Sequence, residues 1–155
     1  MKFTETMTVF SEIPDQITLD INISNCPHRC PECHSPWLRE DIGEILDEES
    51  LSSLISKNKY IDCVLFSGGD GDHQTILKLA RFIKQKYPNI KTAWYSGDDE
   101  IDSEIWDSRI LDFYKAGSYK KERGPLTSET TNQKLYKLNS KTNEYEDITY
   151  RFWKK

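Results

Sequence analysis

Three of the chain's four cysteines lie close together, in the stretch Cys26-Pro-His-Arg-Cys30-Pro-Glu-Cys33, with the spacing C-x3-C-x2-C. Three thiolates at this spacing can converge on one point from a single loop, which suits a metal centre. A cubane iron–sulfur cluster has four irons, so three cysteine ligands leave one iron open to a substrate or cofactor. The spacing therefore predicts a [4Fe–4S] cluster on Cys26, Cys30 and Cys33 that acts on a molecule bound to it.

A structural zinc ion is the alternative for this loop, with His28 or His34 as a fourth ligand. Zinc sites, however, commonly pair two C-x2-C units or use a distant second pair of ligands. The remaining cysteine, Cys63, lies within an apolar run, and the remaining histidine, His73, is placed in the first turn of a helix. A free cysteine behaves as a small buried hydrophobe, so Cys63 is expected in the core. Ligand number and softness favour the cluster over zinc.

Two short polar turns follow apolar runs further along the chain. In Ser67-Gly68-Gly69-Asp70, the glycines allow close approach of a ligand to the backbone, and their carbonyls together with Asp70 could hold an ammonium group. The alternative is an ordinary strand-to-helix turn, with Asp70 or Asp72 as the helix N-cap. The second turn, Tyr95-Ser96-Gly97, offers a hydroxyl that can bond a carboxylate or a ribose.

The length and charge of the chain narrow the classes of protein to consider. With 155 residues it is the size of one domain, with a core over about 16–116 and an extension over about 117–155. Its net charge of −5 argues against a general nucleic-acid binder. No apolar run approaches the roughly 20 residues that span a bilayer, and the N-terminus lacks a secretory hydrophobic region. We expect a cytoplasmic protein with reduced thiols.

The hydrophobic pattern alternates between strands and helices, after a mixed stretch over 1–15 that ends in a turn. Alternation of this kind predicts an α/β fold with a parallel sheet. Functional loops of such sheets lie at the carboxyl ends of the strands, so the cysteine loop and both polar turns should line one rim. The expected strands are 16–23, 60–66, 90–95 and 110–114; the expected helices are 47–57, one that carries the apolar stripe from Ile76 to Tyr87, and 101–108.

Residues 134–153 predict a terminal β-hairpin around the turn at 139–143. Leu135 and Tyr136 are placed on one arm, and Ile148, Tyr150 and Phe152 on the other.

The order of these motifs resembles that of the radical S-adenosylmethionine (SAM) enzymes: C-x3-C-x2-C after the first strand, then Gly-Gly and an acidic residue after the second. The resemblance implies a partial (β/α) barrel or an open, mostly parallel sheet. It also implies that SAM chelates the open iron through its amino and carboxylate groups. Ser67, Gly68, Gly69 and Asp70 would then hold its methionine end, with Ser96 as a further contact.

Less specific motifs over residues 16–136 resemble those of one group within that superfamily, the activases of anaerobic ribonucleoside-triphosphate reductase. They are the short length, Trp94-Tyr-Ser-Gly97, Cys33-His-Ser-Pro36, and Gly124 to Tyr136 with Thr130-Thr-Asn-Gln133. The resemblance implies a flavodoxin-like electron donor, reductive cleavage of SAM, and a glycyl radical formed on the reductase. Asn132 and Gln133 are the candidate contacts with that partner, because a chain this short has little left to form a lid.

Two positions depart from the pattern of these families. Glu32 stands where many radical SAM enzymes carry an aromatic residue, so adenine contacts must come from elsewhere. Ser128-Glu-Thr-Thr precedes Asn132-Gln133 where many activases carry Arg-Gly-Ser.

Three other functions remain open at this stage. They are an activase of another glycyl-radical enzyme, such as pyruvate formate-lyase, a small-molecule radical SAM enzyme, and a zinc-stabilised binding module without catalysis. The metal content of anaerobically purified protein separates the last from the others, and the identity of the protein that acquires a radical separates the two activases.

Overall fold

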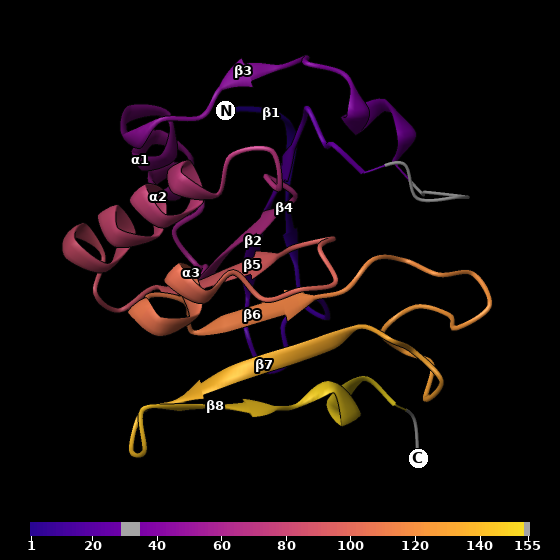
Figure 1. Ribbon diagram of the computed structural model, residues 1–155. Helices are drawn as coiled ribbons and strands as arrows, with labels where there is room; N and C mark the ends of the chain where they lie inside the picture. The colour runs from indigo at the N-terminus through magenta and orange to yellow at the C-terminus, as the bar shows by residue number, and fades with distance from the viewer. Residues whose placement is uncertain (29–34, 154–155) are drawn as a thin grey trace.

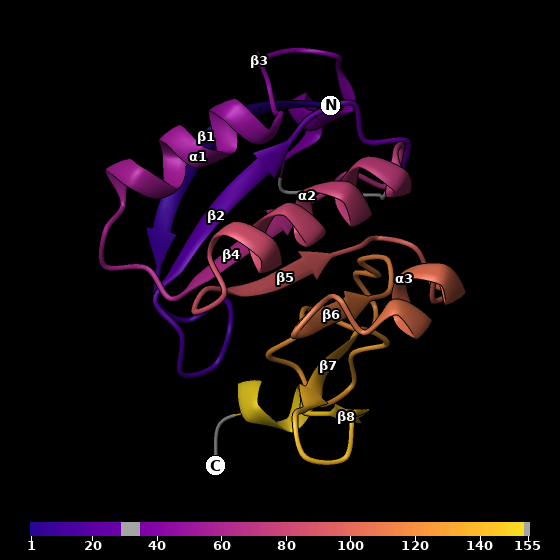
Figure 2. The same cartoon turned by 90° about the vertical axis from the view of Figure 1, so that its left-hand side faces the viewer.

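The computed structural model describes residues 1–28 and 35–153 (Figure 1). These residues form an eight-stranded sheet in the order β3-β1-β2-β4-β5-β6-β7-β8. Three α-helices lie on one face of the sheet, as the two views in Figures 1 and 2 show. The strands are β1 Lys2–Val9, β2 Thr18–Ile23, β3 Glu44–Ile45, β4 Cys63–Ser67, β5 Lys91–Tyr95, β6 Phe113–Ala116, β7 Lys134–Asn139 and β8 Glu144–Asp147; the helices are α1 Glu48–Lys57, α2 His73–Lys86 and α3 Ser103–Ser108, with 3-10 turns η1 Pro36–Arg39 and η2 Thr149–Phe152.

The sheet is mixed, so the predicted partial (β/α) barrel or mostly parallel sheet is wrong. Only the central pairs β2–β4, β4–β5 and β5–β6 are parallel. The pairs β1–β2, β1–β3, β6–β7 and β7–β8 are antiparallel, which makes four of the seven pairings. The physical reason is β1, which pairs along most of β2 and occupies the edge where a further parallel strand would have to add. Within the described residues, β3 and β8 form the two edges of an open sheet.

The parallel centre follows from apolar runs that bury both faces of the sheet. Val64, Phe66 and Trp94 are fully buried in the larger core cluster, beneath the helices. Helix α2 contributes the apolar stripe that the sequence predicted, with Ile76 and Ile83 fully buried. The three strand–helix–strand connections therefore place the carboxyl ends of β2, β4 and β5 at the same edge.

The start of each long helix is fixed by an aspartate. The Asp47 side chain accepts a hydrogen bond from the Ser50 backbone N–H, and Ser50 Oγ accepts one from the Asp47 backbone N–H, forming a capping box at α1. Asp72 accepts from the backbone N–H of Thr75 at the start of α2. Of the two candidate caps after the glycine turn, Asp72 is the cap, and Asp70 is left for another role.

A smaller apolar cluster lies on the sheet face that the helices leave uncovered. Cys63 belongs to it and is fully buried, which confirms its place in the core. Burial raises the pKa of the Cys63 thiol to about 12, so this cysteine is an inert packing residue. No helix among the described residues is long and apolar enough to cross a membrane.

The C-terminal hairpin is confirmed as the antiparallel pair β7–β8, but its second arm ends earlier than predicted. Thr149 donates from its backbone N–H and its hydroxyl to Asp147 Oδ1, over 2.9 and 2.5 Å. These bonds turn the chain into η2, so Tyr150 and Phe152 lie in a 3-10 turn and not on a strand.

Candidate functional site

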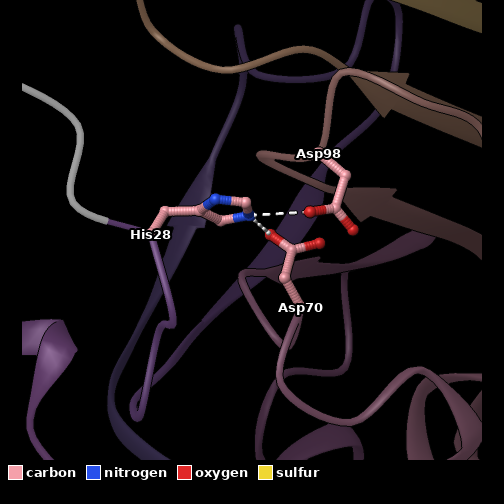
Figure 3. Close-up of side chains that lie close together, drawn as sticks. All are labelled: His28, Asp70 and Asp98. Atoms are coloured by element: carbon pink, nitrogen blue, oxygen red, sulfur yellow. Dashed lines mark ion pairs between the residues drawn. The ribbon is translucent and has the colours of Figure 1, made fainter.

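Three loops that follow parallel strands meet at one edge of the sheet. His28, in the loop after β2, has its Nε2 3.2 Å from Asp70 Oδ2 in the turn after β4. The same nitrogen lies 2.9 Å from Asp98 Oδ1 in the turn after β5. Figure 3 shows the three side chains converging from their separate loops. The predicted rim is therefore confirmed for the part of the cysteine loop that the structure describes.

The cysteine loop is closed at its base by backbone hydrogen bonds. Asn25 N–H donates to Glu40 over 2.9 Å, and Cys26 N–H donates to Leu38 over 2.8 Å. Cys26 is partly exposed and is not in a disulfide. The other two predicted ligands, Cys30 and Cys33, and the alternative ligand His34 lie outside the described residues.

The glycine turn has the backbone conformation that its sequence suggested. Gly68 and Gly69 have φ angles of +106° and +91°, in the region that favours glycine. A Cβ on Gly69 would lie only 2.8 Å from Ile76 Cδ1 of helix α2. The Gly68 carbonyl was expected to be available to a ligand, but it accepts a hydrogen bond from Trp94 Nε1 over 2.6 Å. The turn is thus held in place by the core beneath it.

Two predicted SAM contacts, Asp70 and Ser96, are bonded to each other. Ser96 Oγ donates to Asp70 Oδ1 over 2.5 Å, and Gly97 N–H donates to Asp70 Oδ2 over 2.7 Å. The Asp70 side chain is only 2% exposed. Ser96 Oγ also accepts from the backbone N–H of Asp98 over 3.0 Å. Asp70 and Ser96 therefore cross-link the turns after β4 and β5.

Ser67, the first residue of the predicted SAM-binding turn, bonds a carboxylate that the sequence reasoning missed. Its Oγ donates to Asp20 Oδ1 of strand β2 over 2.5 Å. Burial raises the pKa of Asp20 to about 6, the nearby Glu12 and Glu5 add to the rise, and the Ser67 bond opposes it. Period-two alternation on β2 placed Asp20 on the opposite side from the apolar residues but gave no sign that it would be half-buried.

His73, the first residue of α2, forms a second histidine–carboxylate contact at this edge. Its Nδ1 lies 2.7 Å from Asp102 Oδ2, and its Nε2 lies 3.1 Å from Asp98 Oδ2. Burial opposes a charge on His73, but the hydrogen bond to Asp102 and the charges of Asp98, Asp102 and Asp70 raise its pKa. Burial, with the neighbouring Asp70, raises the pKa of Asp98. Sequence reasoning missed Asp98 and Asp102, whose only signal was an acidic stretch after a strand.

A cavity of about 330 Å³ opens between the cysteine loop and the glycine turn. Asn25, immediately before Cys26, lines it together with Gly69, Gly71 and Asp72. The remaining lining residues are Met1, Lys2, Ile23, Ser24 and Asp41. A Cβ on Gly71 would lie 3.3 Å from the Asn25 carbonyl oxygen, so the two loops approach closely here. Asp70 and Ser96 do not line this cavity.

The predicted partner contacts lie at the same edge, beside the end of β6, and differ from each other. Gln133 is 6% exposed, so the structure gives its side chain little surface to offer a partner. Asn132 Nδ2 donates to the Ser118 carbonyl over 3.0 Å and lines a separate cavity of about 260 Å³ with Asp99 and Lys120. Both residues fasten the C-terminal segment to the end of β6.

Comparison with known proteins identifies the type of domain. The family model described as "4Fe-4S single cluster domain" matches residues 17–136, which is more than half of the chain. No curated protein and no solved structure matches the chain. The matched range includes the whole cysteine loop and both polar turns. The chain therefore belongs to the 4Fe-4S single cluster domain family and is a cluster-binding domain.

Proposed function

We propose that this domain is a radical SAM activase, which binds SAM beside its cluster and generates a glycyl radical on an anaerobic ribonucleoside-triphosphate reductase. One observation carries the proposal: the cavity of about 330 Å³ is bounded by the residue before Cys26 and by the glycine turn. A molecule in this cavity would touch Asn25, at the base of the cysteine loop, and Gly69 and Gly71 of the glycine turn.

The residues around Cys26 fit an iron–sulfur cluster. Iron–sulfur clusters are held by cysteine thiolates, and Cys26 is partly exposed and outside any disulfide. The backbone bonds from Asn25 and Cys26 to Glu40 and Leu38 bring both ends of the loop together. In this proposal Cys30 and Cys33 supply the other two ligands, and one iron keeps an open position for SAM.

The chain's own residues would bind and orient SAM. Gly69 and Gly71 of the glycine turn line the cavity, and the Trp94 bond to the Gly68 carbonyl holds the turn in place. The bonds of Ser67 to Asp20 and of Asp70 to Ser96 fix the two ends of that turn. We therefore assign direct SAM contact to the glycines, and positioning of the turn to Ser67, Asp70 and Ser96.

A reduced [4Fe–4S] cluster would supply one electron that breaks the S–C5′ bond of SAM, giving methionine and a 5′-deoxyadenosyl radical. Cluster potentials reach about −700 mV, which suits reduction of a sulfonium by way of a flavodoxin-like donor. That radical would take a Cα hydrogen from a glycine of the reductase and leave as 5′-deoxyadenosine. A protein docked on the edge of the sheet would also exclude water from the cavity.

Reductive cleavage of SAM tests the proposal. The chain is reconstituted anaerobically with iron and sulfide, mixed with SAM and a strong reductant, and analysed for 5′-deoxyadenosine and methionine. We expect both products in equal amounts. A chain with a full cluster that forms neither product would refute SAM chemistry, and a colourless chain with stoichiometric zinc on its cysteines would identify a zinc module instead.

The partner is tested separately. The cluster-loaded chain is mixed with SAM, reductant and either an anaerobic ribonucleoside-triphosphate reductase or a pyruvate formate-lyase, and EPR spectroscopy reports any glycyl radical. We expect the radical on the reductase. A radical on the lyase alone would keep the SAM chemistry but assign the chain to the other activase.

A further inference from the structure

The histidine and the two carboxylates in Figure 3 have the arrangement of a metal-ion site made of nitrogen and oxygen ligands. His28 Nε2 lies 3.2 Å from Asp70 Oδ2 and 2.9 Å from Asp98 Oδ1, and all three ligand atoms lie within 4.8 Å of one another. Two ligands about 2.1 Å from one ion are about 3.0 Å apart in octahedral geometry and about 3.4 Å apart in tetrahedral geometry. The spacings from His28 to both carboxylates therefore match those of ligands sharing one ion.

The side chains that would bind the ion are oriented by further hydrogen bonds, as metal ligands usually are. Asp70 offers Oδ2, which also accepts from the Gly97 N–H over 2.7 Å, while its Oδ1 accepts from Ser96 Oγ over 2.5 Å. Asp98 offers Oδ1 while its Oδ2 lies 3.1 Å from His73 Nε2. His73 is oriented in turn by Asp102, 2.7 Å from its Nδ1. Each carboxylate thus directs one oxygen at the ring nitrogen of His28.

The environment of the His28 ring nitrogen also favours a bound cation. Its Nε2 is buried, and within the described residues it has no hydrogen bond of acceptable geometry, although it lies beside two carboxylate oxygens. Two carboxylates that face one ring nitrogen in a half-buried setting favour a cation between them. A divalent ion at this point would satisfy the nitrogen and balance the charge.

The geometry points to a second metal site, in which His28 Nε2, Asp70 Oδ2 and Asp98 Oδ1 bind one divalent cation of the zinc, iron(II) or manganese(II) type. Imidazole and carboxylate ligands suit these ions, whereas the thiolates of the neighbouring loop suit an iron–sulfur cluster. The ion would join the start of the cysteine loop to the ends of β4 and β5. The site does not depend on the proposed SAM chemistry, because its ligands do not line the cavity assigned to SAM.

Zinc binding to a chain without its cluster ligands tests this site. In a Cys26→Ser, Cys30→Ser, Cys33→Ser variant, stripped with a chelator and shown to be folded by circular dichroism, calorimetric titration measures Zn²⁺ binding. We expect one Zn²⁺ per chain. His28→Asn or Asp98→Asn, added to this variant, should each weaken binding by at least about tenfold.

Glu100→Gln is the matched control, because it removes one negative charge from the same exposed turn without touching the three ligands. Its affinity should equal that of the parent. Absence of Zn²⁺ binding, or equal binding in His28→Asn and Asp98→Asn, would overturn the proposal. If the triple variant does not fold, the same titrations on the cluster-loaded chain, whose thiolates are occupied, give the same two outcomes.

Discussion

Ser96 donates a hydrogen bond to Asp70 over 2.5 Å, and this bond joins the turn after β5 to the glycine turn after β4. The sequence presented these residues as two separate contacts for one ligand. In the structure each satisfies the other, with the Asp70 side chain only 2% exposed. The pair explains how two short turns, from strands that are neighbours in the sheet, keep a fixed relation at the edge where Cys26 lies.

Replacing Asp70 with alanine should loosen that relation. Asp70→Ala leaves the Ser96 hydroxyl and the Gly97 N–H without their acceptor, which should lower the free energy of unfolding by about 1–3 kcal/mol. Because the turn shifts, the dissociation constant for SAM should rise while the iron content stays unchanged. Denaturant unfolding, equilibrium dialysis with SAM and iron analysis measure the three quantities. Asp107→Ala, at an exposed position, is the control, and an unchanged SAM affinity in Asp70→Ala would contradict the positioning role.

The glycine at position 69 should not tolerate a side chain. Gly69→Ala places a methyl group 2.8 Å from Ile76 Cδ1 and forces alanine to a φ of +91°, so we expect a loss of about 1–3 kcal/mol in unfolding free energy. Adding Ile76→Val removes the contacting methyl but not the backbone strain. Gly69→Ala should therefore lower the unfolding free energy less in the Ile76→Val background than in the parent chain, but it should still lower it. Full recovery would show that crowding, and not the φ angle, selects glycine here.

The indole of Trp94 should matter beyond its size. Trp94→Phe keeps an aromatic ring in the core but removes the hydrogen bond to the Gly68 carbonyl, which should cost about 1–3 kcal/mol in unfolding free energy. SAM affinity should fall as well, because the glycine turn loses its anchor. Trp37→Phe, at a half-exposed position, is the matched control and should change neither quantity. A Trp94→Phe chain as stable as its parent would show that this bond contributes nothing.

Asp20 should make the fold less stable as the pH rises. Its pKa is about 6 in the folded chain and 3.8 as the reference value, so between these values the folded state binds more protons than the unfolded state. The contribution of Asp20 to the free energy of unfolding is therefore fully present below about pH 4 and is lost as the pH rises through about 6. The shift corresponds to at most about 3 kcal/mol. Asp20→Asn should match the parent near pH 4 and exceed it in unfolding free energy at pH 7.

Chemical denaturation of both chains at several pH values checks this difference. Using the difference between the parent and Asp20→Asn cancels the titration of groups that the two chains share. A constant difference from pH 4 to pH 7 would show that Asp20 titrates alike in the folded and unfolded chains.

Cluster retention should depend on the clustered cysteines and not on the buried one. Cys30→Ala should abolish the cluster while the apo-chain keeps its circular dichroism spectrum, because Asn25 and Cys26 still close the base of the loop through backbone bonds. Cys63→Ala is the matched control and should keep a full complement of iron, since Cys63 is buried in the core. Unfolding of the apo-chain in Cys30→Ala would instead favour a structural metal.

Local patterns in the sequence were sufficient to predict the central strands and helix α2. The alternation over Ile17 to Ile23 and the apolar run before Ser67 predicted strands β2 and β4, and the stripe from Ile76 to Ile83 predicted helix α2. These patterns are strong because the elements bury most of their apolar residues. The meeting of the loops at one edge followed from the parallel order alone.

Strand β1 could not be predicted in the same way. Of its residues only Phe3 is buried, and the segment Lys2–Val9 is otherwise threonine, glutamate and other partly exposed residues. It becomes a strand by pairing with β2, a contact that its own sequence does not specify. Missing it led directly to the wrong expectation of a barrel or mostly parallel sheet.

The sequence predicted the loop and the turn of the candidate site but not the contacts among its ionisable side chains. Glycine pairs and cysteine spacing are local signals, so the turn at Gly68 and the loop at Cys26 could be found. The contact of His73 with Asp102 joins positions far apart in the sequence, and each residue alone resembles an ordinary helix end. Only the folded chain shows that His28, Asp98 and Asp70 converge.

The central claim is that three cysteines leave one iron of the cluster open, and that SAM binds there. Mössbauer spectroscopy of the reconstituted chain, recorded with and without SAM, tests it most directly because it reports each iron site. We expect four irons per chain, as the family requires, with the signal of one iron changed by SAM. A [4Fe–4S] spectrum that SAM leaves unaltered would contradict the claim.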